Sequence, residues 1–359
     1  MNTPKHFISS DWGTSNFRLR VVVTNTLEIV AEHTSGLGIR ELNERFEQSG
    51  EGNRLAFYSA YLQTQLAELR SLSVVPDTPA RTTCSAPPTA GGTGANTTRE
   101  TTPPGRSTGG AEKELNAQLP VVISGMASAN IGMYELPYAT LPITATARNF
   151  VTKGLTLHPC QHLRLISGVQ SENGMMRGEE TQALGLLPLM AGEGDGTLLL
   201  PGTHSKHLSF VGDAFTGFAS YMTGELFEII SRRSILANSV ASGAWNERTG
   251  ACFRQAVLTG CKDGFSSHLF AVRAGHVLRE TDPTDNFYRL SGLLIGDELS
   301  HLPNNTKGKI YLAGSGPLLR LYRYALEILG FGERLTVYAD EALEAALLAG
   351  QREILLRKQ

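Results

Sequence analysis

The first apolar positions of the chain fall into short runs that polar turns separate. Phe7 and Ile8 open the first run, and a second run from Phe17 to Val23 follows a turn of small polar residues. β-Branched and aromatic residues in this arrangement predict a hairpin of two strands. The run from Leu27 to Ala31 predicts a third antiparallel strand. The segment 54–72 carries apolar residues at helical spacing and predicts a helix.

The same arrangement occurs again in the second half of the chain. An apolar run from Thr197 to Leu200 leads into a turn of small residues, and a second run ends at Val211. A further predicted strand, 310–313, ends in a small-residue loop and precedes a helix over 318–329. Two such strand–turn–strand units predict two related α/β halves. We divide them into an N-terminal domain, 1–192, and a C-terminal domain, 193–359.

Both turns consist of glycine and small polar residues. Such a turn can leave several backbone N–H groups pointing outward, where they suit phosphate oxygens. The candidate ligands for the phosphates of a nucleotide are Gly13, Thr14, Ser15 and Asn16 in the first turn and Gly202, Thr203 and His204 in the second, with Lys206 as an added cation. Ordinary hairpin turns remain the alternative for both.

Asp11 stands directly before the first turn. Its carboxylate would repel a phosphate group, so we expect it to hold a Mg²⁺ ion through water. The alternative is an aspartate that only helps to form the turn.

Two loops follow predicted strands, and ligands of open α/β sheets collect at the carboxyl ends of strands. Ser128 and Asn130 follow the strand 119–124 and could hydrogen-bond sugar hydroxyl groups, although a helix cap and turn is the alternative. The backbone can approach a flat ligand closely at Gly314 and Ser315, because little side chain intervenes. A plain strand-to-helix turn is the alternative there.

A predicted helix from about Gly178 begins with Glu179 and Glu180. The helix dipole favours carboxylates in a first turn, and that explanation suffices for one of the two. The helix directly precedes the second hairpin. This position gives the two glutamates a second interpretation, as carboxylates that take part in the reaction. Arg177 beside the pair would suit an anionic substrate, or it could be a partner for Glu180.

The segment 77–113 differs from the rest of the chain in composition. The segment 77–113 contains no Val, Ile, Leu, Met, Phe, Trp or Tyr, so it cannot bury enough surface to offset its ordering entropy. We predict a disordered surface insertion there.

The chain as a whole has 359 residues, 41% of them hydrophobic and 18% charged, which is typical of a globular protein.

Charge and cysteine content limit the partners and the compartment. The formal net charge of −2 gives no electrostatic case for nucleic acid or an anionic membrane surface. The start lacks the apolar run of a signal peptide, and no apolar stretch is long enough to span a bilayer. Four cysteines without paired spacing favour a reducing cytoplasm. The sequence does not fix the oligomeric state, and a homodimer is retained as one alternative.

Six short motifs follow one another in a specific order. They are Asp-Trp-Gly-Thr-Ser-Asn-x-Arg from Asp11, Ser-Gly-Met-Ala-Ser-Ala-Asn-Ile-Gly from Ser124, Met-Arg-Gly-Glu-Glu-Thr-Gln from Met176, Pro-Gly-Thr-His-Ser-Lys from Pro201, Thr-Gly-Glu-Leu from Thr223 and Ser-Gly-Leu-Leu-Ile-Gly from Ser291. Together they resemble the 2-dehydro-3-deoxygalactonokinase family, within the superfamily of acetate and sugar kinases, heat-shock ATPases and actin. The resemblance runs from about Phe7 to about Leu348, apart from the insertion. It implies an α/β fold of two actin/hexokinase-like ATPase domains, each ribonuclease H-like, with an interdomain cleft.

The resemblance also implies ATP-dependent phosphorylation of 2-dehydro-3-deoxy-D-galactonate to its 6-phosphate in galactonate catabolism. Glu179 is then the expected base for the hydroxyl proton, with Glu180 second, and Gly314 and Ser315 would border adenosine. The substrate carboxylate needs a cation, and the candidates are Arg18, Arg40 and Arg177. A kinase for another sugar or sugar acid, or a non-enzymatic sugar or nucleotide sensor on the same fold, are the alternatives.

One position departs from the wider superfamily. Many members have an aspartate leading the second hairpin, whereas Pro201 precedes Gly202 here. We therefore expect Asp11 to carry more of the metal binding. The final helix, 340–351, has small residues that would let it pack against the Glu179 helix.

Overall fold

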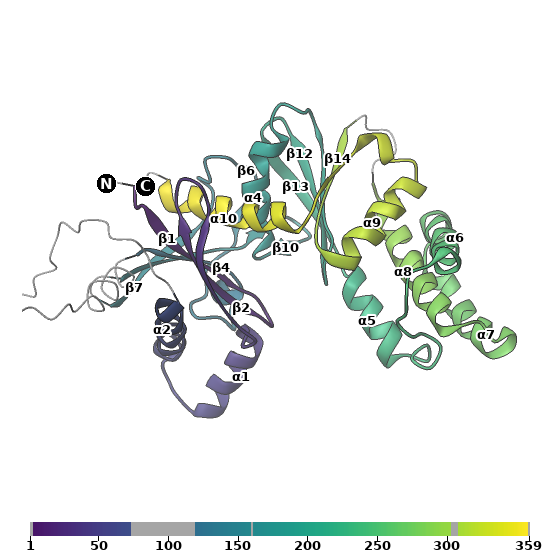
Figure 1. Ribbon diagram of the computed structural model, residues 1–359, viewed down its shortest axis with the longest axis horizontal. Helices are drawn as coiled ribbons and strands as arrows, with labels where there is room; N and C mark the ends of the chain where they lie inside the picture. The colour runs from purple at the N-terminus through teal and green to yellow at the C-terminus, as the bar shows by residue number, and fades with distance from the viewer. Residues whose placement is uncertain (1–2, 73–118, 159–160, 303–307, 358–359) are drawn as a thin grey trace, which may run out of the picture. The chain divides into compact units, whose positions relative to one another are not determined.

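The computed structural model describes residues 3–72, 119–158, 161–302 and 308–357 (Figure 1). The chain divides into two compact units. The first unit comprises Met1–Leu136 and Thr152–Ser167, and the second comprises Pro137–Val151 and Gly168–Gln359. The predicted insertion, 77–113, lies outside the described residues.

The first unit contains a six-stranded sheet in the order β3-β2-β1-β4-β8-β7. Its strands are β1 (His6–Trp12), β2 (Phe17–Val23), β3 (Ile29–Ser35), β4 (Val121–Gly125), β7 (Thr152–His158) and β8 (Gln161–Ile166). The first three are antiparallel neighbours, β4 and β8 run parallel to β1, and β7 is antiparallel to β8. Every residue of β4 is buried, as expected for a central strand covered on both faces.

The described part of the first unit also contains the helices α1 (Ile39–Ser49) and α2 (Arg54–Leu72). Tyr58, Leu62, Leu66 and Leu69 of α2 are fully buried in the core of this unit, so the predicted helix over 54–72 is confirmed. The predicted third strand begins two residues later than expected. Leu27 has φ 62°, a left-handed conformation that belongs to the turn before β3.

The second unit repeats the sheet plan of the first. Its strands are β11 (Gly196–Leu200), β12 (Ser205–Val211), β13 (Ala214–Tyr221), β14 (Lys309–Ala313), β15 (Leu335–Tyr338) and β6 (Ile143–Thr144), in the order β15-β14-β11-β12-β13-β6. Three antiparallel strands are again followed by two strands parallel to the first of them. The predicted α/β class with two related halves is confirmed.

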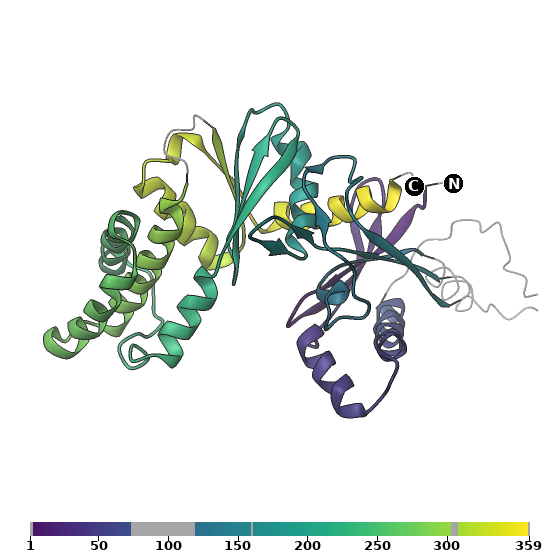
Figure 2. The ribbon, with the colours of Figure 1, turned by 180° about the vertical axis from the view of Figure 1, so that it is seen from behind.

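Helices cover both faces of the second sheet. On one side of the sheet lie α5 (Thr223–Arg233), α6 (Glu247–Asp263), α7 (Leu269–Arg279), α8 (Pro283–Ser300) and α9 (Gly316–Ile328), with α7 farthest from it, and on the other side lie α4 (Glu179–Met190) and α10 (Asp340–Leu356) (Figure 2). A small sheet of β5 (Ala139–Thr140), β9 (Val169–Gln170) and β10 (Met175–Met176) also belongs to this unit.

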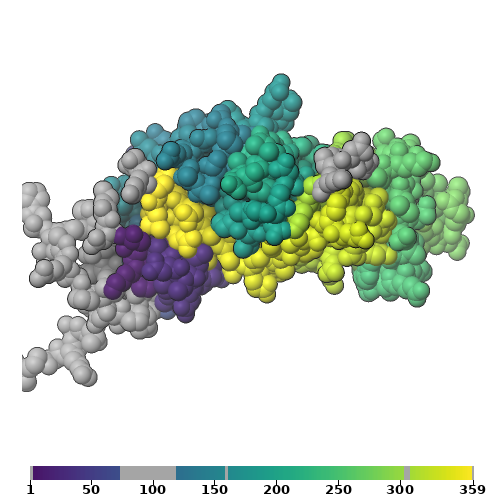
Figure 3. Space-filling model, turned by 90° about the horizontal axis from the view of Figure 1, so that it is seen from above, coloured from purple at the N-terminus to yellow at the C-terminus, as the bar shows by residue number. Residues whose placement is uncertain are grey.

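Helices α4 and α10 cross at very short range. A Cβ atom on Gly185 would collide with the backbone oxygen of Ala346, and one on Gly350 would collide with that of Thr181. Only residues without a side chain permit this approach, so the predicted packing of the final helix against the Glu179 helix is confirmed. Figure 3 shows α10 in yellow beside teal residues of the second unit.

The predicted boundary between residues 192 and 193 differs from the observed division. Residues 137–151 and 168–192 belong to the second unit. The reason is packing rather than chain order, because α4 packs on α10 and β6 pairs with the edge strand β13.

Candidate active site

The second predicted phosphate turn joins β11 and β12, and the start of α5 packs on it. A Cβ atom on Gly224 would lie 2.5 Å from the backbone oxygen of Gly202. The backbone N–H of Glu225 donates to the oxygen of Thr203 at 3.0 Å, and His204 Nε2 lies 2.7 Å from the Glu225 carboxylate. The turn is therefore held by a helix N-terminus, a place where backbone N–H groups and the helix dipole favour anions.

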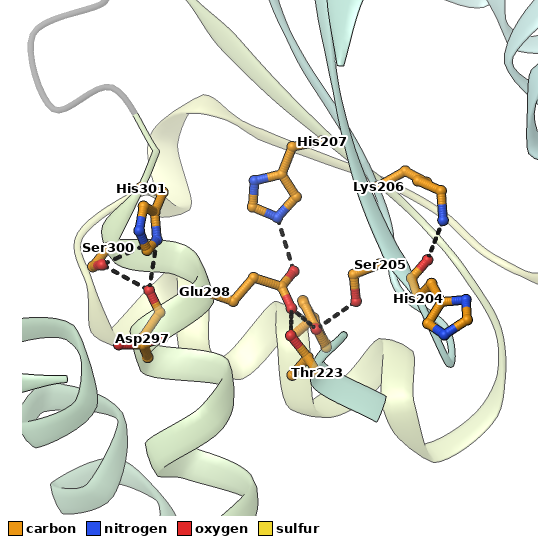
Figure 4. A network of polar contacts seen from close by, with 10 residues as sticks. His204, Ser205, Lys206, His207, Thr223, Asp297, Glu298, Ser300 and His301 are labelled. Carbon is orange, nitrogen blue, oxygen red and sulfur yellow. Dashed lines mark hydrogen bonds and ion pairs between the residues drawn. The ribbon is translucent and has the colours of Figure 1, made fainter. Parts of the chain in front are cut away.

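Lys206 connects this turn to the helix that carries the glutamate pair. Its side chain is only 3% exposed, and its ammonium donates to the backbone oxygen of His204 at 2.7 Å (Figure 4). It also lies 3.1 Å from Glu179 Oε1. The structure thus brings the predicted base and the predicted phosphate ligands of the second turn into one bonded group.

The two glutamates of the pair have different surroundings. Glu179 is 30% exposed, and its second oxygen accepts a hydrogen bond from the backbone N–H of Arg177 at 3.1 Å. Glu180 is 1% exposed and accepts bonds from the Gly178 N–H at 2.6 Å and the Thr181 hydroxyl at 2.9 Å. Burial, followed by the neighbouring charge of Glu179, raises the pKa of Glu180 to about 8.

A large cavity lies within the second unit beside the same turn. Its volume is about 1300 Å³, and Gly202, Thr223 and Gly224 are among its lining residues. The remaining lining comes largely from α6, α8, α9 and the segment before α6, and its aromatic members are Phe227, Trp245, Phe287, Tyr288, Tyr322 and Tyr324. The cavity therefore joins a phosphate-type turn to walls rich in aromatic side chains.

The predicted adenosine loop lies next to the second hairpin. A Cβ atom on Gly314 would lie 3.6 Å from Cδ of Pro201. Gly314 and Ser315 do not line the cavity, but Pro317 and Leu318, which follow them in α9, do. The predicted adenosine residues therefore directly precede residues that face the cavity.

The first turn has a corresponding arrangement in the first unit. The N–H of Gly13 donates to the oxygen of Asn16 at 2.9 Å, which closes the turn. The backbone N–H groups of Ile39 and Arg40, at the start of α1, donate to the oxygens of Gly13 and Thr14 at 3.0 and 3.1 Å. Ser15, the remaining predicted phosphate ligand of this turn, is exposed.

Asp11 precedes this turn at the end of β1, opposite Arg18 of β2. Burial raises the pKa of Asp11, and the positive charges of Arg18 and Arg20 act in the opposite direction. Among the described residues, no group of three or more His, Cys, Asp and Glu side chains could hold a metal ion. Mg²⁺ is commonly bound by one or two carboxylates together with nucleotide phosphates and water, so a single aspartate fits that ion.

The predicted sugar-binding residues differ in how far their side chains are exposed to solvent. Ser128 is fully buried, whereas the side chain of Asn130 is exposed. Arg18 and Arg40 are exposed in the first unit. In the second unit, the guanidinium of Arg177 lies 4.2 Å from the centroid of the Tyr138 ring, which is cation–π contact.

Sequence reasoning missed a buried polar group behind the second turn. His207, Tyr322 and Thr223 surround the carboxylate of Glu298, which is 2% exposed. Thr223 opens the Thr-Gly-Glu-Leu motif, and in the structure it is the first residue of α5 and its hydroxyl bonds Glu298. No motif spacing in the sequence indicates that His207, Tyr322 and Glu298 lie together.

Two α/β units with corresponding strand orders, each with a glycine turn that packs against the start of a helix, define a duplicated ATPase fold. The family model described as 2-keto-3-deoxy-galactonokinase matches residues 89–350. The chain belongs to this family, and it is a sugar-acid kinase. No helix in the described ranges combines the length and the apolar character needed to cross a membrane.

Individual relatives agree with the family assignment. A probable 2-dehydro-3-deoxygalactonokinase of Rhizobium meliloti (strain 1021) is 36% identical over 247 residues, 66% of this chain and 79% of that protein. The 2-dehydro-3-deoxygalactonokinase of Escherichia coli (strain K12) is 27% identical over 237 residues, 64% of this chain and 77% of that one. The crystal structure of a candidate 2-dehydro-3-deoxygalactonokinase from Sinorhizobium meliloti covers 98% of both chains with a TM-score of 0.71 and 29% identity.

Proposed function

We propose that the protein transfers the terminal phosphoryl group of ATP to the 6-hydroxyl of 2-dehydro-3-deoxygalactonate. One observation carries the proposal: buried Lys206 bonds both the second phosphate turn and the carboxylate of Glu179. Phosphoryl transfer asks a protein mainly for positioning and charge neutralisation, and this group supplies both next to a proton acceptor. The family description and the names of the relatives support the sugar acid as acceptor.

The nucleotide site of the proposal includes the cavity of the second unit. Its volume of about 1300 Å³ is ample for adenosine and phosphates, and its aromatic walls suit a flat base. Gly314 and Ser315 would border the adenosine from the loop beside Pro201. The turns at 13–16 and 202–204 would bind phosphate oxygens through backbone N–H groups, with Lys206 adding positive charge.

Glu179 is the proposed base. It would take the hydroxyl proton as the substrate oxygen attacks the terminal phosphorus and the bond to ADP breaks. Its 30% exposure leaves the carboxylate within reach of a substrate. Glu180 remains the second candidate, but a carboxyl group with a pKa of about 8 is mostly protonated at pH 7 and is a poor proton acceptor there.

Asp11 would hold Mg²⁺, which would neutralise phosphate charge as the reaction proceeds. The burial that raises the pKa of Asp11 disfavours its charged form, and a bound dication would reverse this effect.

The carboxylate of the sugar acid would be bound by one of Arg18, Arg40 and Arg177. Asn130 is the better placed of the two predicted ligands of the sugar hydroxyl groups, because Ser128 is fully buried.

The proposed location of the protein is the cytoplasm, and cysteines without paired spacing support it.

The test is ADP release with ATP and Mg²⁺ on three acceptors: 2-dehydro-3-deoxygalactonate, its gluconate epimer and a neutral hexose. We expect turnover on the galactonate derivative and a loss of 10² to 10⁴ in kcat for Glu179→Gln, about the usual contribution of a general base. Glu341→Gln is the matched control, because Glu341 is also a first-turn glutamate of a helix, α10, and is exposed. Turnover on the hexose alone would reject the sugar acid, and ATP binding without turnover on any acceptor would favour a sensor.

A further inference from the structure

The carboxylate of Glu298, on α8, is buried and has no part in the proposed chemistry. His207 Nε2 lies 2.8 Å from its Oε1 atom. Its Oε2 atom accepts a hydrogen bond from the hydroxyl of Tyr322 at 2.6 Å. It also accepts one from the hydroxyl of Thr223, which Figure 4 shows beside Glu298. A buried carboxylate is tolerated when such partners satisfy it, and here three elements outside α8 supply them.

The proton positions follow from the number of donors. Tyr322 has one hydroxyl proton, which it donates to Glu298. The contact of 2.9 Å between the hydroxyls of Ser205 and Tyr322 must therefore use the proton of Ser205. Burial, and then the charge of Glu298, raise the pKa of Tyr322 well above its ordinary value, so the tyrosine keeps the proton that it donates.

These bonds meet at the second phosphate turn. Ser205 and His207 are the first and third residues of β12, which begins directly after the turn, and they face the same side of the strand. Thr223 begins α5, and the next residue of that helix, Gly224, packs on Gly202. Thr223 and Tyr322 also line the cavity of the second unit. One carboxylate thus fixes the strand after the turn, the helix that packs on the turn, and the wall of the adjacent cavity.

Apolar packing could hold these elements together, but it would not fix their relative positions to a fraction of an ångström. Directional bonds from three elements to one carboxylate do so. We propose that Glu298 is a positioning residue that sets the geometry of the turn at 202–204 for the phosphates of the nucleotide. This inference rests on the proposed function, because it presumes that the turn binds nucleotide phosphate.

The test compares a ligand with phosphates and one without. Calorimetric Kd values for Mg²⁺-ADP and for adenosine are measured on the wild type and on Glu298→Gln. We expect ADP binding to weaken about tenfold, the usual size of a bond to a charged group, while adenosine binding changes less than about twofold. An equal loss for both ligands, or no loss for ADP, would overturn the positioning role.

Tyr322→Phe keeps the test decisive if Glu298→Gln does not fold. It removes a single bond to the carboxylate and retains the ring, so a selective loss of about threefold or more for ADP is expected. Tyr58→Phe is the control, because it removes another buried tyrosine bond, to the oxygen of Ile131 in the first unit, and ADP binding should stay at the wild-type value. Wild-type ADP binding without turnover of the sugar acid would reject the substrate alone, whereas no ADP binding would reject both proposals.

Discussion

The two phosphate-type hairpins share a backbone scaffold and differ in the charges around it. Gly38, just before α1, packs on Thr14 and Ser15, and Gly224, in α5, packs on Gly202 and Thr203. A side chain at either glycine would collide with the turn. Both sheets therefore present a turn against the beginning of a helix, which is a recurrent way to bind anions through backbone groups.

The side chains around the two turns suit different ions. Asp11 precedes the first turn, whereas the corresponding position before the second, two residues ahead of its glycine, is the apolar Leu200. The second turn has the ammonium of Lys206 and, through it, the carboxylate of Glu179 from α4. The comparison teaches that one backbone arrangement can carry different charges: a carboxylate precedes the first turn, whereas an ammonium paired with a carboxylate adjoins the second.

Asp11→Asn, at the first hairpin, should have the largest effect on kcat among the variants that test this comparison. We expect kcat to fall by roughly 10² to 10³, with a raised Mg²⁺ requirement, because Asp11 is the proposed metal ligand and the described residues contain no cluster of three or more His, Cys, Asp and Glu side chains that could replace it. Steady-state rates across a Mg²⁺ titration provide the measurement. Asp213→Asn, at the exposed turn after β12, is the control and should behave as the wild type. Unchanged Mg²⁺ dependence in Asp11→Asn would remove the metal role.

Glu180→Gln should flatten the pH dependence of stability. Because the pKa of Glu180 is raised from 4.5 to about 8 in the folded protein, the folded state holds a proton that the unfolded state releases. Its stabilising contribution is full below pH 4.5 and is lost as the pH rises through about 8. Urea unfolding at pH 5.5 and 8.5 should show the wild type losing about 2–3 kcal/mol more than the variant. Parallel pH profiles would contradict the burial argument.

Lys206→Met tests the group that distinguishes the second hairpin. Removing this buried ammonium leaves Glu179 without its partner, and we expect a loss of about 2 kcal/mol in the free energy of unfolding. Lys309→Met is the matched control, because Lys309 and Glu193 form an ion pair in which both side chains are more than 40% exposed. That variant should lose less than about 0.5 kcal/mol. Equal losses would mean that the Lys206 pair is an ordinary surface contact.

Gly38→Ala and Gly224→Ala test what the hairpins share. Each added Cβ would lie 2.4–2.5 Å from a backbone oxygen of its turn, so both variants should lose about 1–2 kcal/mol and bind ADP more weakly. Denaturant unfolding and calorimetry measure the two effects. Gly36→Ala is the control for the first hairpin, because nothing lies within 4 Å of an added Cβ there. A neutral result at one glycine only would show that just one turn depends on its helix.

The sequence was sufficient for the parts of the site that are local in the chain. Turns, their flanking strands and the α4 glutamates follow from residue types within a few positions, and the structure agrees with them. Ser128 shows the limit of the same reasoning: it follows β4 as expected and remains a predicted ligand, but its side chain is fully buried. Chain position gives the end of the strand on which a residue lies, but not whether its side chain faces a ligand or the core.

Contacts between distant residues were beyond the sequence. Thr223 and Glu298 are 75 residues apart, and Ser205 and Tyr322 are 117 apart, so no local periodicity connects them. The compact units also divide the chain elsewhere than at the predicted boundary after residue 192. Small residues in the final helix did predict its packing on α4, but nothing local in the sequence indicates that residues 137–151 and 168–192 belong to the second unit.

The crossing of α4 and α10 has a consequence for the order in which the protein is made. Helix α10 follows α4 only after the second sheet and helices α5 to α9, so a ribosome must synthesise all of them before α4 gains its partner. We expect a nascent chain that ends before Asp340 to contain both hairpins but to lack the helix against which α4 packs. Arrested chains of that length should then be more sensitive to protease in α4 than chains that include α10.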